Sequence, residues 1–448
     1  MRTNWLMLGC LIILVLLIGC AKDDPPAPTV EEAGEEVIGL LQAGEYDKLY
    51  EIWFSNELQE SLSAVELARD WEEKVTEGDF VELSSLQADN LTEDLDVVEA
   101  SLEYTTDYFD IRLIFNKETR LVGLSLSDGF TKRELPESIK EEEIIVGKET
   151  EYELEGLLTL PKEGEGKFPA VVLVHGSGPS DRDETAFAYK PFRDLAWGLA
   201  EQGIAVIRYD KRTLAYGNEM AKHTAHLTVY EETVEDAIRA AELVKSDPRI
   251  DPEHVYLAGH SLGGMLAPRI DAEGGDFAGL ISLAGSPRPL WEIIYEQNLY
   301  LIEKLIANEE EQKEQLASVE EEYQKAQNLQ KLTTEKSKEV TVFGINGYYL
   351  KEMAEYDVQS YIGELDKPLL ILQGEDDFQV FYDKDYAYWQ ELLENHDDAT
   401  FISYPGLNHF FIAYEGAGEG TLREYEYPNQ VDENVIQDIG EWILEKFN

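Results

Sequence analysis

One short segment has the residue types and spacing of a catalytic nucleophile. The chain contains the run Gly259-His260-Ser261-Leu262-Gly263, which follows an apolar stretch (255–258) and precedes a segment that can be helical (265–270). Between a strand and a helix, a Gly-x-Ser-x-Gly pattern predicts a strained turn that holds the serine hydroxyl clear of the backbone. Glycines on both sides would let the strand and the helix approach closely. The pattern alone is a weak indication, because it recurs by chance about once in ten chains of this length.

Candidate acid and base residues lie downstream of this serine, each after an apolar run that predicts a strand. The run 368–372 leads to Glu375-Asp376-Asp377, and the run 400–404 leads to a loop that contains His409. In the order serine, acid, histidine, such residues can form a triad in which the imidazole takes the serine proton and a carboxylate orients the imidazole. We therefore expect His409 to be the general base that acts on Ser261.

With these motifs, the chain from about residue 141 to residue 448 resembles the α/β-hydrolase superfamily, in its dienelactone-hydrolase and serine-aminopeptidase-like branch. The resemblance implies an α/β fold with a mostly parallel sheet. It places the triad acid at Asp377, in a Gly-x-x-Asp-x-x-Val pattern, with the neighbouring Asp376 as the alternative. It also implies an oxyanion hole formed by the backbone N–H groups of Ser177, in the loop after a buried strand, and of Leu262.

The other histidines near these motifs have simpler interpretations. His260 adjoins the expected nucleophile, but a neighbour on a sharp turn points its side chain elsewhere, so we interpret it as a packing residue. His175 is interpreted as a structural hydrogen-bonding residue beneath the site. His223 and His226 have a spacing that can place both on one helical face, yet the sequence shows no third ligand for a metal. We expect neither a metal nor another cofactor.

Two charged segments adjoin the expected site. Asp181-Arg182-Asp183-Glu184 continues the loop after Ser177 and could orient a polar substrate group or hold a free amino terminus, although a solvated loop is the simpler interpretation. Tyr209-Asp210-Lys211-Arg212 follows an expected strand and is interpreted as a structural, salt-bridged turn.

A long insertion separates two expected strands of the hydrolase region. Residues 287–361 contain a narrow apolar stripe at helical spacing in a highly charged stretch, followed by a segment richer in aromatics. We predict a helical cap over the active site, with a surface hairpin or a dimer arm as alternatives. The candidates for lining the substrate pocket are Trp291, Tyr295, Phe343, Tyr348 and Tyr349.

A smaller domain is expected to precede the hydrolase domain. Residues 30–130 contain helix-like segments followed by four alternating, strand-like runs, which predict an α+β layer. The pattern Leu41-x-x-Gly44-x-Tyr46 and this layout resemble an uncharacterised domain often found ahead of such hydrolases, which could have a cone-like shape. The segment contains no histidine, and we expect a binding or spacer role.

The first twenty residues have the features of a bacterial lipoprotein signal. One arginine precedes an apolar run that is short for a transmembrane helix, and the run ends in Leu17-Ile18-Gly19-Cys20, which resembles a lipobox. We expect a signal peptide (1–19), lipidation at Cys20, a proline-rich linker (20–29), and an extracytoplasmic protein anchored to the bacterial membrane. An uncleaved anchor and an ordinary secretion signal are the alternatives. Both cysteines lie in this segment, so the globular part has no disulfide.

The charge of the chain is strongly negative, with 37 basic and 92 acidic residues and a formal net charge of −55. Such a surface repels nucleic-acid phosphates and anionic lipid head groups, which argues against both as partners. A solubilising acidic surface is the simplest interpretation, and adaptation to high salt or high pH is the sharper hypothesis. The charge also disfavours anionic substrates.

These observations favour a serine hydrolase that cleaves small-molecule carboxylic esters through an acyl-enzyme, with a neutral or aromatic acyl group. A serine peptidase of the aminopeptidase kind could use the same triad, and would need carboxylates to hold the substrate amine. A non-catalytic surface protein whose small domain binds a ligand is the third hypothesis.

Overall fold

The computed structural model describes residues 29–75, 79–90, 95–105, 108–128, 133–164, 167–220, 222, 226–356, 358–363, 365–416 and 418–447. The expected signal peptide, Cys20 and all but the last residue of the expected linker lie outside these residues. The chain forms two compact units: one extends to residue 133 and includes 425–428, and the other contains 134–424 and 429–448. Within the described part, no helix is long and apolar enough to cross a membrane.

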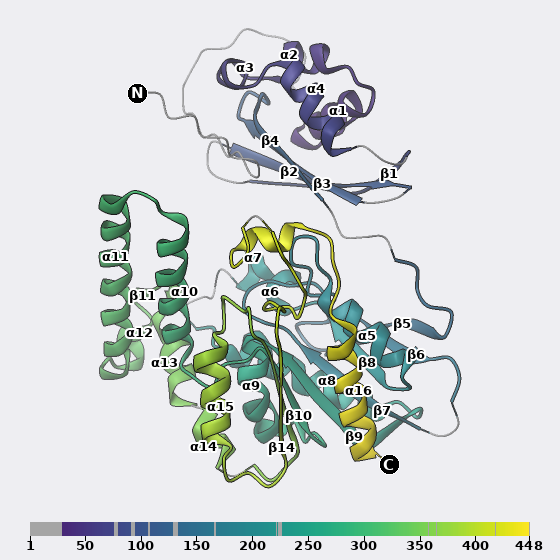
Figure 1. Ribbon diagram of the computed structural model, residues 1–448, viewed down its shortest axis with the longest axis vertical. Helices are drawn as coiled ribbons and strands as arrows, with labels where there is room; N and C mark the ends of the chain where they lie inside the picture. The colour runs from purple at the N-terminus through teal and green to yellow at the C-terminus, as the bar shows by residue number, and fades with distance from the viewer. Residues whose placement is uncertain are drawn as a thin grey trace. The chain divides into compact units, whose positions relative to one another are not determined.

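The smaller unit packs four helices against a four-stranded antiparallel sheet (Figure 1). Two of the helices begin at capping boxes, in which Thr29 and Ser63 each exchange hydrogen bonds with the glutamate three residues later. The predicted α+β class of this unit is confirmed. Its elements are α1 (Val30–Gln42), α2 (Tyr46–Trp53), α3 (Asn56–Ser61), α4 (Ala64–Lys74), β1 (Phe80–Asn90), β2 (Leu95–Tyr104), β3 (Tyr108–Asn116) and β4 (Leu121–Asp128).

The larger unit is built on an eight-stranded, mostly parallel sheet, which confirms the predicted α/β fold class. The pairs β5–β6 and β6–β8 are antiparallel, and all other neighbours are parallel. In spatial order the strands are β14 (Ala399–Tyr404), β13 (Leu369–Gly374), β10 (Leu280–Leu283), β9 (Ile250–His260), β7 (Phe168–Val174), β8 (Ala205–Tyr209), β6 (Leu154–Pro161) and β5 (Ile139–Val146).

The central strands are mainly apolar and are buried along almost their whole length, because helices cover the sheet (Figure 1). α5 (Pro191–Glu201) packs against α16 (Glu433–Phe447), whereas α8 (Glu235–Ser246) and α9 (Leu262–Ile270) pack against β9. The chain leaves β7 toward β8 and returns to β9 on the other side, so strand order reverses beside β7. In open α/β sheets, ligand sites form at the carboxyl ends of strands next to such a reversal.

Shorter helical segments connect these elements. They are α6 (Arg212–Ala215), α7 (Gly217–Met220), η2 (Tyr230–Val234), η3 (Asp271–Gly275), η5 (Tyr382–Tyr386), α15 (Ala387–Leu392) and η6 (Leu422–Glu426).

The insertion between β10 and β13 is mainly helical, as predicted. α10 and α11 run side by side as a hairpin (Figure 1). A small cluster of buried side chains, with Ala326, Leu329, Val342 and Leu350 at its centre, holds the insertion together. Its elements are α10 (Leu290–Leu305), α11 (Glu309–Asn328), η4 (Leu329–Lys331), α12 (Thr334–Ser337), β11 (Thr341–Val342), β12 (Ile345–Asn346), α13 (Gly347–Glu355) and α14 (Val358–Ile362).

Candidate active site

Ser261 occupies a strained turn between β9 and α9. Its backbone has φ 52° and ψ −114°, a conformation that is costly for a residue with a side chain. The flanking glycines are required by the close approach of the chain: a Cβ added to Gly263 would lie 2.2 Å from the carbonyl oxygen of Val174, and one added to Gly259 would lie 2.2 Å from the backbone of Gly263. The sequence pattern therefore forms the turn that a nucleophile elbow requires.

The carboxylate of Asp377 and the imidazole of His409 are joined by a short hydrogen bond. Nδ1 of His409 lies 2.7 Å from Oδ2 of Asp377, and both side chains are buried. The other carboxylate oxygen accepts hydrogen bonds from the backbone N–H groups of Gln379 (2.7 Å) and Val380 (3.0 Å). Asp376, the alternative acid, is exposed. The structure therefore brings His409 together with Asp377 and not with Asp376.

Hydrogen bonds to the Asn408 side chain and to the backbone hold the loop that carries His409 in shape. The carboxamide oxygen of Asn408 accepts hydrogen bonds from the N–H groups of Phe410 (3.0 Å) and Ile412 (3.1 Å). The backbone N–H of Asp376 donates to the carbonyl of Leu407 (3.1 Å), which ties this loop to the loop of Asp377. The positions of the acid and the histidine therefore depend on each other.

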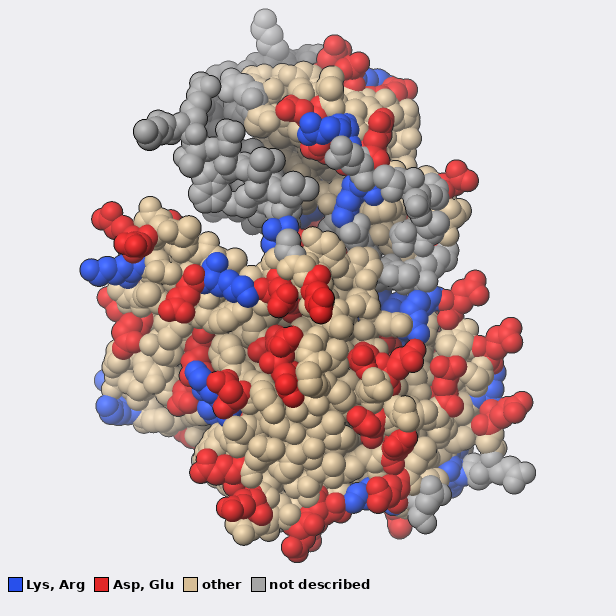
Figure 2. All heavy atoms as spheres, viewed as in Figure 1, with Lys and Arg blue, Asp and Glu red and all other residues tan. Residues whose placement is uncertain are grey.

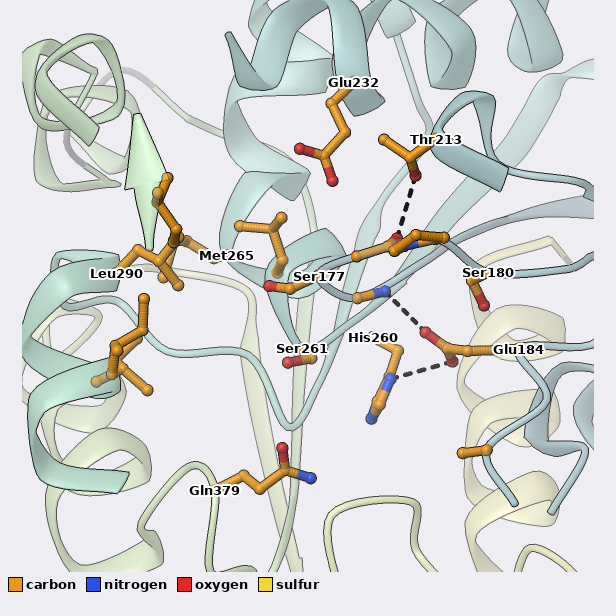
Figure 3. A pocket seen from close by; sticks show the side chains of 18 of the residues that line it. Ser177, Ser180, Glu184, Thr213, Glu232, His260, Ser261, Met265, Leu290 and Gln379 are labelled. Atoms are coloured by element: carbon orange, nitrogen blue, oxygen red, sulfur yellow. Dashed lines mark hydrogen bonds and ion pairs between the residues drawn. The ribbon is translucent and has the colours of Figure 1, made fainter. Parts of the chain in front are cut away.

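A cavity of about 770 Å³ opens at the carboxyl edge of the sheet. The expected nucleophile, base and oxyanion residues all line it, namely Ser261, His409, Ser177 and Leu262. Figure 3 shows the hydroxyl of Ser261 near the middle of the cavity wall, with Ser177 on one side and Gln379 on the other. Asp377 is not among the lining residues, which places it behind the histidine as a triad acid requires.

The walls of the cavity are largely apolar. No lysine or arginine is among the described residues that line it, and two carboxylates, those of Glu184 and Glu232, reach it. Such a lining favours a neutral and largely apolar ligand. The apolar lining residues include Met220, Leu227, Leu262, Met265, Leu290, Ile293, Ile294, Ile345, Tyr349, Val380 and Phe410.

The prediction of which cap residues line the cavity is wrong for four of the five aromatic residues. Tyr349 lines it, but Trp291 and Phe343 pack inside the insertion, Tyr295 stacks on Tyr323 at 4.0 Å between ring centroids, and Tyr348 lies against Lys338. The residues of α10 that line the cavity are Leu290, Ile293, Ile294 and Gln297.

The reason for this difference is helix geometry. The four lining residues of α10 recur at i, i+3, i+4 and i+7, which is one face of a helix, whereas Trp291 and Tyr295 lie on the neighbouring face and meet α11. That spacing is present in the sequence and could have identified the lining face.

The charged loop 181–184 is only partly exposed, and its carboxylates bind groups of the protein, contrary to the simpler interpretation of a solvated loop. The carboxylate of Asp181 accepts hydrogen bonds within its own loop, from the N–H groups of Asp183 and Thr185 and from the Thr185 hydroxyl. Asp183 pairs with Lys190 and Arg208, both at 3.0 Å. Glu184, which is 6% exposed, accepts a hydrogen bond from the N–H of Gly176 and pairs with His260. All three carboxylates are therefore already engaged.

The turn after β8 is salt-bridged, as interpreted from its residue types. Asp210 pairs with Arg182 at 2.6 Å, and the buried Arg212 pairs with Asp236. Nζ of Lys211 lies 2.6 Å from Oε1 of Glu232 and donates to the carbonyl of Gly176 at 2.7 Å. This turn therefore supports the loop that precedes Ser177.

The histidines outside the expected triad differ in their contacts. Nε2 of the buried His175 lies 2.9 Å from the carbonyl oxygen of Asp181, and burial lowers the pKa of this histidine to about 4, so the ring is neutral and structural. His260 does more than pack, because it also forms a buried ion pair with Glu184. Sequence reasoning missed this pair, since the two residues are far apart along the chain. His223 lies outside the described residues, and no group of three potential metal ligands occurs among the described ones.

One parallel strand ends in a strained serine turn, and the strand two places along the sheet ends in a carboxylate that is paired with an imidazole. This is the architecture of the α/β-hydrolases. The family model described as "Serine aminopeptidase, S33" matches residues 168–415, more than half of the chain, and the chain belongs to this family. Residues 34–124 match a family of proteins of unknown function, DUF3887.

Comparison with known proteins finds relatives by sequence and by structure. Esterase EstD of Thermotoga maritima is 34% identical over 396 residues, which cover 87% of this chain and 90% of that protein. Among solved structures, Est1E from Butyrivibrio proteoclasticus has 18% sequence identity and a TM-score of 0.44, over 68% of this chain and 98% of that one. A dienelactone hydrolase from Anabaena variabilis has 19% identity and a TM-score of 0.40, over 69% of this chain and 98% of that one.

Proposed function

We propose that this protein is a serine hydrolase that cleaves carboxylic esters through an acyl-enzyme. One observation carries the proposal: the His409 imidazole, hydrogen-bonded to buried Asp377, lines the same cavity as Ser261 on its strained turn. The similarity to Esterase EstD over most of both chains supports ester cleavage.

The proposed reaction uses only groups of this chain. The hydroxyl of Ser261 attacks the ester carbonyl while Nε2 of His409 accepts its proton, and Asp377 stabilises the resulting imidazolium. The backbone N–H groups of Ser177 and Leu262 stabilise the oxyanion of the tetrahedral intermediate. His409 then gives the proton to the departing alcohol, and the same groups activate water to release the acid from the acyl-enzyme.

An ester substrate is favoured over a peptide because the carboxylates of the loop 181–184 are already bound within the protein. The family description also names a serine aminopeptidase. An aminopeptidase needs carboxylates that are able to hold a substrate amine. Those of Asp181, Asp183 and Glu184 are already bound by groups of the protein, and Glu232 is paired with Lys211. The apolar cavity wall favours a neutral acyl group instead.

The test compares purified wild-type protein with Ser261→Ala on p-nitrophenyl acyl esters and on aminoacyl p-nitroanilides. We expect ester turnover by the wild type, a loss of about 10⁴-fold or more in the variant, and much slower anilide turnover. A fluorophosphonate probe should label the wild type and not the variant. Full ester turnover by Ser261→Ala would refute the serine mechanism, faster anilide turnover would favour the peptidase, and an unlabelled, inactive wild type would favour the non-catalytic binding protein.

We also propose that the protein is a lipoprotein, anchored outside the cytoplasm through Cys20. The support is the sequence alone: an apolar run of signal-peptide length that ends at this cysteine and is followed by a proline-rich segment. In bacteria expressing the full chain, labelled fatty acid should be incorporated and the protein should sediment with membranes. Cys20→Ala should abolish incorporation. Equal incorporation in this variant would contradict the assignment.

A further inference from the structure

The proposed reaction leaves one buried ion pair beside the nucleophile unused. Nδ1 of His260 lies 3.0 Å from Oε2 of Glu184, and these side chains are only 6% and 8% exposed, respectively. Figure 3 shows the pair directly next to Ser261. Burying two charged side chains to this degree has a considerable desolvation cost, so their position beside the site requires an explanation.

The contacts of His260 favour a ring that is protonated on both nitrogens. Nε2 lies 3.0 Å from the carbonyl oxygen of His409, and Nδ1 faces the carboxylate of Glu184. A carbonyl oxygen and an ionised carboxylate are both acceptors, so an imidazolium suits both contacts, although the approach of Nδ1 to Oε2 does not have hydrogen-bond geometry. The rings of His409 and Phe410 lie against this imidazolium at 4.6 Å and 5.0 Å between centroids.

One side of the pair has almost no room for solvent, whereas on the other side both residues line the cavity of about 770 Å³. A void of only about 10 Å³, lined mainly by apolar residues, adjoins Glu184 and His260, and a cavity needs roughly that volume for a single water. On that side no more than about one water can screen the two charges, which strengthens their attraction.

Glu184 connects this pair to the loop that is expected to bind the oxyanion. Its Oε1 accepts a hydrogen bond from the N–H of Gly176 at 2.7 Å. The loop lies close to the nucleophile here, since a Cβ added to Gly176 would be 3.2 Å from the Cβ of Ser261. The carbonyl of Gly176 accepts from Lys211 at 2.7 Å, so the peptide units on both sides of Gly176 are fixed.

Fixing Gly176 sets the direction of the next N–H group. The carbonyl of Gly176 and the N–H of Ser177 belong to one planar peptide unit, and in a trans peptide they point in opposite directions. Lys211 and Glu184 together therefore determine where the Ser177 N–H points. The hydrogen bond from His260 to the His409 carbonyl links the same pair to the loop of the proposed base.

We propose that Glu184 and His260 are positioning residues, whose ion pair holds the oxyanion loop, the serine turn and the histidine loop in register for catalysis. This inference rests on the proposed serine mechanism. Neither residue exchanges a proton with substrate; the pair acts through the backbone groups of Gly176 and His409.

The ionisation of the pair defines the pH range in which it holds. Burial alone would lower the pKa of His260, but the Glu184 carboxylate, the His409 carbonyl and Asp377 raise it. Burial alone would raise the pKa of Glu184, but His260, His175 and the Gly176 N–H lower it. Lys211 and the His409 ring are the other titratable groups that face this region.

The sign of the pH effect follows from these directions. The contribution of His260 is complete below its usual pKa of about 6.5 and is lost as the pH rises through its raised pKa. The contribution of Glu184 is complete above its usual pKa of about 4.3 and is lost as the pH falls through its lowered pKa. The pair is therefore fully intact between about pH 4.3 and about pH 6.5, and it loosens at higher pH as His260 loses its proton.

The test measures kcat and KM for a p-nitrophenyl ester between about pH 5 and pH 10 in full-length wild type and Glu184→Gln. Because the oxyanion forms only in the transition state, we expect kcat to fall about tenfold or more while KM changes less than about twofold. Without the carboxylate the pKa of His260 falls, so the alkaline limb of kcat should move to lower pH. Asp183→Asn is the matched control, since it removes a paired carboxylate from the same loop without contacting Gly176; its kcat and pH profile should match the wild type.

Fluorophosphonate labelling separates the two possible failures. A wild type that is neither labelled nor active refutes the serine mechanism together with this inference. A wild type that is labelled and active, with Glu184→Gln matching it in kcat at every pH, refutes the inference alone. If Glu184→Gln does not fold, nitrogen NMR of histidine-labelled wild type still decides: we expect one buried imidazole protonated on both nitrogens at about pH 6, below the usual histidine pKa, and a neutral His260 ring at that pH would overturn the proposal.

Discussion

The carboxylate of Asp377 is the most tightly held group of the site. Besides the 2.7 Å contact with His409, it accepts hydrogen bonds from two backbone N–H groups and from the side chain of Gln373 at 2.9 Å. With this many donors, the carboxylate keeps one orientation before any substrate binds. The imidazole of His409 is thereby held with Nδ1 toward Asp377.

Replacing this carboxylate should therefore reduce turnover far more than binding. For Asp377→Asn we expect kcat to fall by about 10³–10⁴-fold with little change in KM, because an amide no longer stabilises the imidazolium or its correct tautomer. Steady-state kinetics on a p-nitrophenyl ester measure both constants. Asp376→Asn is the control, since this neighbour is exposed and should retain wild-type kcat. A larger loss in Asp376→Asn than in Asp377→Asn would reverse the assignment of the acid.

The residues of the expected triad could be proposed from the sequence because each follows an apolar run in a fixed order. The Glu184–His260 pair could not, because no such pattern links the two residues, which meet only once the loop after β7 has folded over the turn. Residue types gave no sign of this contact, since a glutamate in a charged loop is usually solvated.

At the level of elements, the turn between β9 and α9 is limited by backbone contacts. Gly263 lies against the carbonyl of Val174 at the end of β7, so the first turn of α9 touches the neighbouring strand directly. This contact brings the loop of Ser177 close to Ser261, and it leaves no space for a larger residue.

Gly263→Ala should therefore destabilise the larger unit severely. A methyl group 2.2 Å from a backbone oxygen forces strand and helix apart, and we expect a loss of about 3 kcal/mol or more, with loss of activity. Gly39→Ala in α1 is the matched control, because nothing lies within 4 Å of its added methyl group, and alanine there should stabilise by up to about 1 kcal/mol. Denaturant unfolding measures both. An unfolding curve for Gly263→Ala equal to that of the wild type would contradict the close approach.

The order and class of most elements could be predicted because strands and helices differ in the spacing of their apolar residues. The number of aromatic residues did not indicate which face of the insertion lines the cavity. Trp291 and Tyr295 are large and apolar, but they hold α10 to α11, whereas the aliphatic residues one helical face away line the cavity. Residue type alone did not separate the two faces of α10, whereas the i, i+3, i+4 and i+7 spacing of its lining residues does.

At the scale of the whole molecule, charge is the dominant surface feature. Figure 2 shows acidic side chains spread over the visible face of the larger unit, with basic ones fewer and often beside them. A formal net charge of −55 implies strong self-repulsion, which opposes the compact state and weakens when salt screens it.

Added sodium chloride should therefore raise the melting temperature. The screening length falls from about 30 Å at about 0.01 M salt to about 3 Å at about 1 M, so most of the gain is expected below roughly 0.5 M. Calorimetry at several chloride concentrations measures it, and chloride is preferred to sulfate, which also stabilises proteins by exclusion from their surface. A melting temperature that stays constant or falls up to molar salt would contradict this expectation and the hypothesis of adaptation to high salt.

The place where the insertion joins the sheet has an evolutionary consequence. It leaves the sheet after β10 and rejoins it before β13, two strands that are already hydrogen-bonded to each other, and no residue of the expected triad or oxyanion hole lies within it. Selection can lengthen, shorten or replace this segment while the bond-breaking groups stay where they are. Part of the cavity wall is therefore encoded apart from the proposed catalytic groups, so substrate preference can change there while those groups are kept.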